Sequence, residues 1–186
     1  MARLPYVDKA DASAPVREAL DVVPPLNIFT TIAHAETALR PFLRYGAVLL
    51  GDLQLDPVLR ELAILRVAQL TPHAEYEWVQ HVPITLAVGG TQAQIDALEA
   101  GDIEADAFDE LQRAVLRFTT EVVNDARASD EAFAAVAASL TPREIVELLL
   151  VIGQYMMLAR VMATVEIDLD EPAGTAVIES IDQRAE

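Results

Sequence analysis

The stretch of residues 57–70, which is apolar on nearly every face, places the strongest constraint on how this chain can fold. Its apolar residues are distributed all round a helix: Val58, Leu59, Leu62, Ala63, Ile64, Leu65 and Val67. A helix that is apolar all round is buried among other elements. Asp56 and Pro57 have the residue types of an N-cap and a first helical turn. The sequence therefore predicts a buried helix over residues 57–70.

The rest of the chain also follows a helical pattern, and the predicted fold class is all-α. The other expected helices are 14–22, 27–34 with Asn27 as its cap, 36–50, 73–88, 91–101, 107–124, a short helix capped by Ser129, and 141–166. Pro83 predicts a kink just after His81. We expect an N-terminal segment over 1–24, one helical domain over 25–166, and a loosely ordered acidic tail over 167–186.

The charge and hydropathy of the chain argue against two classes of partner. Its 186 residues include 30 acidic and 13 basic side chains, a formal net charge of -17, which opposes binding to a phosphate backbone. The longest charge-free apolar stretch near the C-terminus, 148–159, is shorter than the ~18 residues of a membrane span. The first residues do not resemble a secretory signal. We therefore expect a cytoplasmic protein with neither nucleic acid nor membrane as partner.

The last expected helix, 141–166, carries two apolar stripes. The first consists of Ile145, Leu148, Leu149, Ile152, Met156 and Ala159, and the second of Val146, Leu150 and Met157. Two apolar faces on one helix indicate contact with the chain's own core on one side and with another surface on the other. The second stripe therefore predicts contact with another subunit, and thus a homo-oligomer.

Glu77 and His81 are the first candidates for chemistry. Four residues apart on a helix, they share one face, and a carboxylate beside an imidazole can move a proton near neutral pH. We expect Glu77 to orient the imidazole and His81 to carry the proton; the alternative is a structural hydrogen bond. Glu61 is the third catalytic candidate, since apolar neighbours raise the pKa of a carboxyl; its alternative is an internal ion pair with an arginine such as Arg66 or Arg160.

No metal and no cofactor are expected. His73 and His81 are about 12 Å apart along a helix, too far to bind one ion. Glu77, His81 and Glu61 alone would form a weakly specified site. The sequence has no P-loop, zinc-finger or dinucleotide-binding motif.

Four residues are candidates for binding a small-molecule substrate: Trp78, Tyr76, Asn27 and His34. Each also has a structural explanation. A lone tryptophan commonly packs in a core, and Tyr76 points away from His81 and could bond across a helix pair. Helix-capping and surface roles explain Asn27 and His34.

Several segments of the sequence together resemble the carboxymuconolactone decarboxylase family, which belongs with the alkyl hydroperoxidase D-like proteins. The similar segments are 27–34, 61–65, 75–81, Gly89, the capping segment at Thr91, and 153–160. The resemblance covers roughly residues 25–170 and implies an all-helical alkyl hydroperoxidase D-like fold that assembles as a homo-oligomer, a dimer, trimer or hexamer. Aligned on His81, the two cysteines of the peroxidase branch fall at Ala74 and Glu77, and the family glutamate falls close to Glu61.

The resemblance implies the decarboxylase branch, because this chain has no cysteine and thiol peroxidase activity requires one. The implied reaction is cofactor-independent loss of carbon dioxide from a carboxylated lactone or related small acid. His81 would supply a proton to the resulting carbanion. Two alternatives remain: another acid/base reaction in the same pocket, such as lactone hydrolysis or isomerisation, or a non-catalytic helical oligomer that binds a small ligand.

Overall fold

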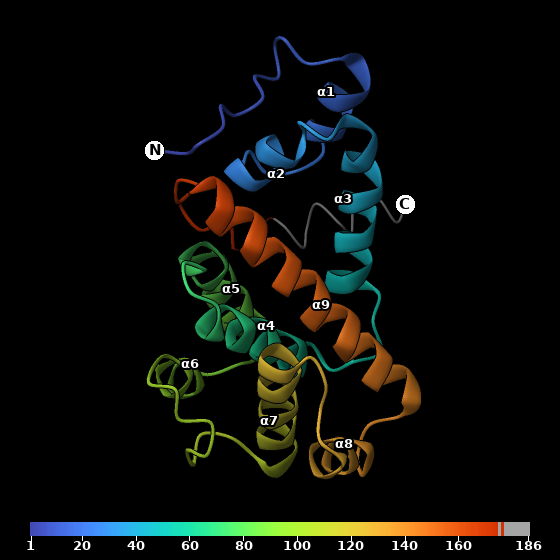
Figure 1. The fold of residues 1–186 in the computed structure, drawn as a ribbon, viewed down its shortest axis with the longest axis vertical. Coiled ribbons are helices and arrows are strands. Elements are labelled where there is room, and N and C mark those ends of the chain that lie inside the picture. Colours follow the sequence, from blue (N-terminus) through green and yellow to red (C-terminus); the bar gives the residue numbers. More distant parts are fainter. Residues whose placement is uncertain (175, 177–186) are drawn as a thin grey trace.

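The computed structural model describes residues 1–174 and 176, and within them all regular secondary structure is helical (Figure 1). The helices are α1 (Ala14–Leu20), α2 (Asn27–Ile32), α3 (Glu36–Gly51), α4 (Pro57–Leu70), α5 (Glu75–Ala87), α6 (Gln92–Glu99), α7 (Glu110–Asp125), α8 (Asp130–Ala137) and α9 (Pro142–Val165). The predicted all-α class is confirmed.

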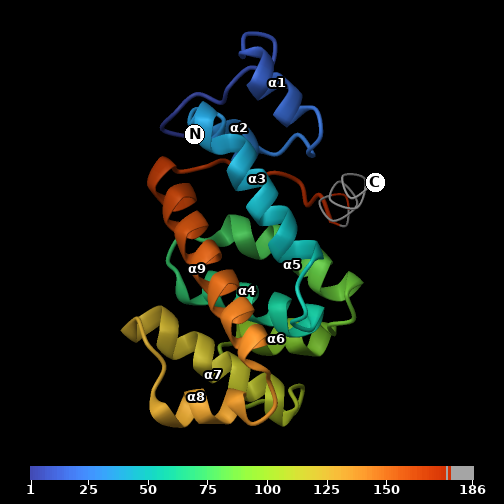
Figure 2. The ribbon, with the colours of Figure 1, turned by 90° about the vertical axis from the view of Figure 1, so that its right-hand side faces the viewer.

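Helix α4 lies at the centre of the bundle, against α5, α7 and α9 (Figures 1 and 2). Every residue from Leu59 to Ala68 is buried, as the all-round apolar pattern predicts. Asp56 caps the helix by accepting hydrogen bonds from the backbone N–H groups of Val58, at 2.9 Å, and Leu59, at 3.2 Å. Because α4 is covered on all sides, a charged side chain on it must find its partner inside the protein.

Helix α9 runs diagonally across the molecule and packs on α3, α4, α5, α7 and α8 (Figure 1). Thr141 and Glu144 form the expected capping box at its start. Among the described residues it is the one helix long and apolar enough, by length and composition, to cross a membrane. The core helix of a bundle meets the same criteria, and the Ile145, Leu148 and Ile152 side chains lie in the core.

Two local expectations differ from the structure. Asn27 is not the cap of α2; Leu26 holds that position, and the Asn27 side chain instead donates to the Asp168 carbonyl. Helix α7 begins at Glu110, not 107, because Asp109 and Gln112 form a capping box there. Helix α5 continues through Pro83, as expected, and ends at Ala87.

The first part of the C-terminal tail is fixed against the bundle, contrary to the loose order expected from its composition. The Asp170 carboxylate accepts hydrogen bonds from the Asn27 backbone N–H and from the Tyr76 hydroxyl. The Gln80 amide bonds to the backbone at 170, 171 and 173. Asp168 pairs with the N-terminal amine and the Tyr6 hydroxyl. This segment is therefore held by polar contacts and by the partly buried Ile167 and Ala173 side chains, which pack against the core; residues 175 and 177–186 lie outside the described chain.

Glu147 on α9 ties the turn before α4 to the core, and its loss should destabilise the protein. Its carboxylate accepts from the backbone N–H groups of Gln54 and Leu55, both at 2.8 Å, and pairs with Arg143 at 2.7 Å. Glu147→Ala leaves two donors without an acceptor, so we expect the free energy of unfolding to fall by about 1–3 kcal/mol in urea denaturation. Glu99→Ala, at a position exposed to solvent, should change it by less than about 0.5 kcal/mol.

The same carboxylate gives this contribution a pH dependence. Burial raises the pKa of Glu147, but the hydrogen bonds from Arg143 and from the two backbone groups outweigh burial and lower it. A lowered folded-state pKa contributes stability above the unfolded-state pKa, and this contribution is lost as the pH falls through the folded-state value. The difference between wild type and Glu147→Ala should therefore shrink in acid; a constant difference would contradict this account.

Candidate active site

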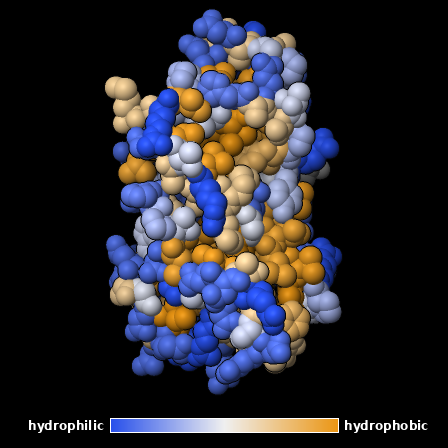
Figure 3. Space-filling model, in the orientation of Figure 1, coloured by the Kyte–Doolittle hydropathy of each residue, from blue (hydrophilic) through white to orange (hydrophobic). Residues whose placement is uncertain are grey.

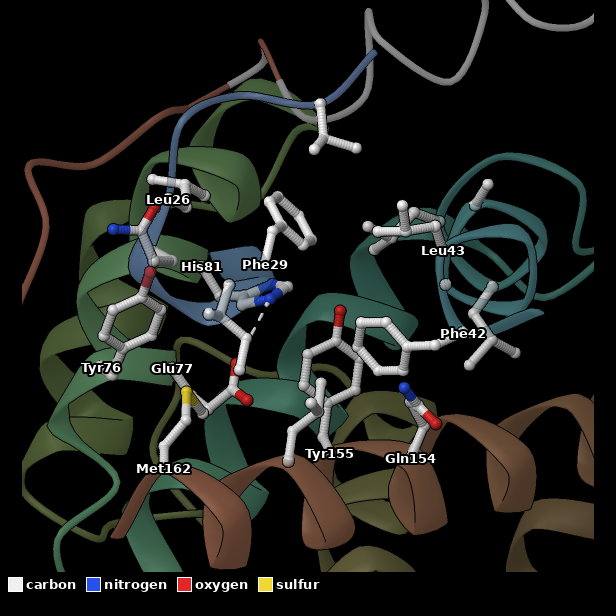
Figure 4. A pocket seen from close by; sticks show the side chains of 18 of the residues that line it. Leu26, Phe29, Phe42, Leu43, Tyr76, Glu77, His81, Gln154, Tyr155 and Met162 are labelled. Carbon is white, nitrogen blue, oxygen red and sulfur yellow. Dashed lines mark ion pairs between the residues drawn. The ribbon is translucent and has the colours of Figure 1, made fainter. Parts of the chain in front are cut away.

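A cavity of about 100 Å³ lies between α2, α3, α5 and α9 (Figure 4). Most of its wall is apolar, with the side chains of Leu26, Ile28, Phe29, Phe42, Leu43, Leu158 and Met162 among those that line it. The polar side chains on the wall are Tyr76, Glu77, Gln80 and His81 from α5 and Gln154 and Tyr155 from α9. Two helices therefore bring all of the cavity's polar groups together.

His81 is held by Glu61, which crosses from α4. The Glu61 Oε2 atom lies 2.7 Å from His81 Nδ1, and its Oε1 atom accepts from Arg60 Nε at 2.8 Å. The Glu61 side chain is completely buried. Arg60 is itself fixed, donating to the Leu50 carbonyl at 2.6 Å. Arg60, Glu61 and His81 thus form a buried charged chain that ends at the cavity.

The predicted orienting role of Glu77 is therefore wrong, because Glu61 makes that hydrogen bond. Glu77 and His81 do share a helix face, but the imidazole turns its Nδ1 atom toward α4. Glu77 Oε2 lies 3.7 Å from the other ring nitrogen, Nε2 (Figure 4). The alternative for Glu61, an internal ion pair with an arginine, is formed, but with Arg60. Arg66 bonds to Thr120 and Gln69, and Arg160 bonds to the Met156 carbonyl.

The charges around His81 fix its tautomer. Burial raises the pKa of Glu61, but the His81 charge, its hydrogen bond and Arg60 together outweigh burial and lower it. An ionised carboxylate only accepts hydrogen bonds, so His81 Nδ1 carries a hydrogen. Burial lowers the pKa of His81, whereas the nearby Glu61 and Glu77 carboxylates raise it, and the net direction is upward. The Nε2 atom is therefore the nitrogen that gains and loses a proton.

Glu77 has the least compensated charge at the site. It is 4% exposed, and its Oε1 atom has no hydrogen-bond partner among the described residues. Burial raises the pKa of Glu77 to about 7; the Glu61 charge adds to the rise, and His81 opposes it. A carboxyl with this pKa exists in both protonation states near neutral pH, which suits it to proton transfer.

Two residues of α9 complete the wall, and neither was among the candidates from the sequence. The Tyr155 ring meets His81 edge to face, with ring centroids 4.8 Å apart and an interplanar angle of 89°. Burial and the two carboxylates raise the pKa of Tyr155 well above its usual value, so its hydroxyl stays protonated. Gln154 Nε2 is buried without a hydrogen-bond partner in the described structure. A Gln-Tyr pair in an apolar helix is the sequence signal that could have identified them.

The four candidates for substrate binding fall in different places. Tyr76 lines the cavity, although its hydroxyl bonds to Asp170. Trp78 is absent from the cavity wall and packs against the cluster that includes Leu62, Leu65 and Phe108. Asn27 holds the tail. His34 is exposed, with Nε2 2.6 Å from the Pro5 carbonyl oxygen.

The described residues contain no group of three or more His, Cys, Asp or Glu side chains placed to hold a metal ion. Glu61 and His81 are joined in the buried chain described above, and Glu77 Oε2 lies 3.7 Å from His81 Nε2.

The comparisons with known proteins agree with this fold. Residues 36–121 match the model of the carboxymuconolactone decarboxylase family. No curated protein is significantly similar to the chain.

Several solved structures share the fold. One is an alkylhydroperoxidase AhpD core, an uncharacterized peroxidase-related protein from Ralstonia eutropha JMP134, with a TM-score of 0.78, 21% identity, and coverage of 91% of this chain and 93% of that one. Another is an uncharacterized peroxidase-related protein from Silicibacter sp. TM1040, with a TM-score of 0.69, 19% identity, and coverage of 86% and 94%. A third is a cysteine-to-alanine variant of the debrominase Bmp8 in complex with 2,3,4-tribromopyrrole, with a TM-score of 0.70, 17% identity, and coverage of 98% and 99%.

The predicted resemblance is thereby confirmed: the chain contains a carboxymuconolactone decarboxylase family segment within an alkyl hydroperoxidase D-like fold, and it has no cysteine.

The raised pKa of Glu77 should be measurable as a loss of stability with rising pH. A carboxyl whose folded-state pKa, about 7, exceeds its unfolded value of 4.5 favours the folded state below pH 4.5, and this advantage disappears as the pH rises to 7. Glu77→Gln cannot ionise. Relative to that variant, wild type should lose about 3 kcal/mol of unfolding free energy between pH 4.5 and 7.5. Parallel stability curves for the two proteins would contradict the assignment.

Proposed function

We propose that this chain is an acid/base enzyme that moves a proton on a small organic molecule bound in the cavity, without a cofactor. The observation that carries the proposal is the Glu77 carboxyl, buried on an apolar wall, with one oxygen unpartnered and the other 3.7 Å from His81 Nε2. Burying such a group costs stability, so a role in binding or chemistry is the natural explanation for its presence.

Glu61, His81 and Glu77 have different roles in the proposed reaction. Glu61 fixes the imidazole plane and keeps hydrogen on Nδ1, so that Nε2 faces the cavity. With a substrate carbon or oxygen near Nε2 and Glu77, one group can remove a proton while the other returns one. The imidazolium, paired with Glu61, stabilises negative charge that develops on an enolate-like intermediate. The apolar wall keeps water away and strengthens these interactions.

Decarboxylation of a carboxylated lactone or related small acid is the reaction that the family match favours. In that reaction the bond to the carboxyl group breaks, carbon dioxide leaves with its bonding electrons retained on the substrate carbon, and that carbanion takes a proton from His81 or Glu77. Isomerisation or lactone hydrolysis would use the same groups. The cavity wall includes no arginine that could bind a substrate carboxylate. This composition favours isomerisation over decarboxylation.

One further observation is consistent with a small organic substrate. The structurally similar debrominase binds 2,3,4-tribromopyrrole, a small single-ring molecule. The proposed function does not include thiol peroxidase activity, because the chain has no cysteine that could form a sulfenic acid or a disulfide.

Replacement of His81 should slow proton transfer strongly in a protein that still folds, because Arg60 continues to pair with Glu61. We expect His81→Ala to slow deuterium exchange at the carbon next to the carbonyl of γ-butyrolactone in D₂O, followed by NMR, by about 10²–10⁴-fold relative to wild type. Carbon dioxide release from γ-carboxymuconolactone, measured in parallel, tests the decarboxylase reaction itself. His34→Ala, at an exposed histidine, serves as the matched control. Equal exchange by wild type and His81→Ala would refute an enzymatic role, provided both proteins are folded.

We also propose that the chain forms a homo-oligomer through α9. Hydrophobic side chains gather over the part of α9 near α8 (Figure 3). Val146, Leu149, Leu150 and Met157 are 54%, 39%, 44% and 39% exposed, and they recur at helical spacing. A row of this kind is typical of a protein–protein contact.

The contact on α9 can be tested by adding charge to it. We expect Leu150→Glu to reduce the molar mass in size-exclusion chromatography with light scattering to that of the monomer, 20.2 kDa. Leu169→Glu, which adds the same charge at another exposed leucine, should leave the mass unchanged. A wild-type protein that is already monomeric at micromolar concentration would refute the proposal.

A further inference from the structure

Among the buried polar side-chain atoms of the described chain that lack a hydrogen-bond partner, two belong to residues that line the cavity. Glu77 Oε1 is an acceptor on the α5 wall, and Gln154 Nε2 is a donor on the α9 wall. Both side chains are more than nine-tenths buried. The third such atom, Arg113 Nε, lies elsewhere. Unpartnered buried atoms are rare in folded proteins, so a pair of opposite character at one cavity indicates that a ligand completes them.

The placement of these groups defines the pattern that the ligand must match. In the close view, Tyr155 stands between Glu77 and Gln154 and directs its hydroxyl into the cavity (Figure 4). That hydroxyl makes no hydrogen bond within the described structure. The cavity therefore offers an acceptor at one end, a donor at the other, and an adaptable hydroxyl between them, on walls that are otherwise apolar.

The size of the cavity limits the ligand to about one small ring. A cavity of about 150 Å³ in another protein holds benzene, and this one measures about 100 Å³. A five-membered ring with one or two substituent atoms is of the right order, whereas a lactone bearing several further groups would require the helices to move apart.

The charges at the site favour a neutral ligand over an anion. Among the residues on the cavity wall, His81 is the one that can carry a positive charge, and its charge is already balanced by Glu61. An anion would also lie near Glu77, which has no arginine or lysine beside it. It could bind well only if Glu77 took up a proton at the same time, whereas a neutral ligand has no such requirement.

We propose, building on the acid/base function above, that the cavity binds an uncharged single-ring molecule that donates one hydrogen bond to Glu77 and accepts one from Gln154. Lactams belong to this class, as do enolised cyclic ketones and other small rings that carry an N–H or O–H group. Gln154 is thereby assigned as a residue that determines specificity without taking part in proton transfer.

Three probes with the same number of non-hydrogen atoms separate the possibilities. They are 2-pyrrolidinone, which has a donor and an acceptor, γ-butyrolactone, which has acceptors alone, and butanoate, which is an anion. In ligand-observed NMR titrations at pH 8, we expect 2-pyrrolidinone to bind about tenfold more tightly than γ-butyrolactone, because the ionised Glu77 can only accept. Butanoate should bind most weakly at pH 8 and gain affinity as the pH falls toward 6.

The pH dependence tests Glu77 without any substitution. Below pH 7 the protonated carboxyl can donate to the lactone carbonyl, so the preference for the lactam should shrink severalfold between pH 8 and pH 6. A preference that is independent of pH, or butanoate binding as tightly as the lactam at pH 8, would overturn the proposal.

Gln154→Leu tests the other end of the ligand. The substitution keeps an apolar side chain of similar size and removes a buried donor without a partner, so we expect the melting temperature to rise by about 3 °C while 2-pyrrolidinone binds about fivefold more weakly. Gln92→Leu, at an exposed position on α6, should change neither quantity. Unchanged lactam affinity in a folded Gln154→Leu protein would refute the role of Gln154.

The outcomes for ligand class and for catalysis can be told apart. If the order of affinities holds but His81-dependent deuterium exchange does not occur, the protein binds this class of ligand without catalysis and the proposed enzyme function is wrong. If exchange occurs but the order of affinities fails, the acid/base function stands and the assignment of the ligand class is wrong.

Discussion

The buried carboxylate of Glu61 is the interaction on which the rest of the site depends. It lies in the middle of α4, a helix covered on every side, and it is completely excluded from solvent. Removing one partner from a buried ion pair costs about 3–5 kcal/mol because the other charge is left unpaired. Arg60 on one side and His81 on the other supply the compensation. The positions of α4 and α5 are therefore coupled by charge as well as by packing, and the imidazole is fixed as a consequence.

The sequence predicts the elements well because their signals are local. The all-round apolar pattern of 57–70 predicts a buried helix, and the capping residues Asp56 and Thr141 mark helix starts that the structure confirms. The same reasoning places Glu77 and His81 on one face. Local spacing fails where the partner comes from another helix. The hydrogen bond of His81 to Glu61 joins residues twenty positions apart, and no periodicity within α5 could indicate it.

Two other features could not be predicted from the sequence for related reasons. The tail at 167–173 is held by polar contacts to Tyr76 and Gln80, which exist only once α5 is in place, and by packing of Ile167 and Ala173 against the core. Gln154 and Tyr155 sit inside a long apolar helix, where a polar side chain can face solvent, a subunit or a cavity. Which of these applies depends on the packing of α9 against α3 and α5. Tertiary contacts thus decide both features.

The position of Glu77 links the chemistry of this chain to that of the proteins it resembles. The resemblance aligns position 77 with a cysteine of the peroxidase branch, and the structure places this side chain on the cavity wall, 3.7 Å from His81 Nε2. A thiol next to a histidine titrates near neutral pH, and burial brings the pKa of Glu77 to about 7 as well. A carboxyl at this position can therefore keep the proton chemistry of the thiol, but it cannot form a disulfide. The resemblance places the second cysteine of that branch at Ala74, so this chain has a thiol at neither position.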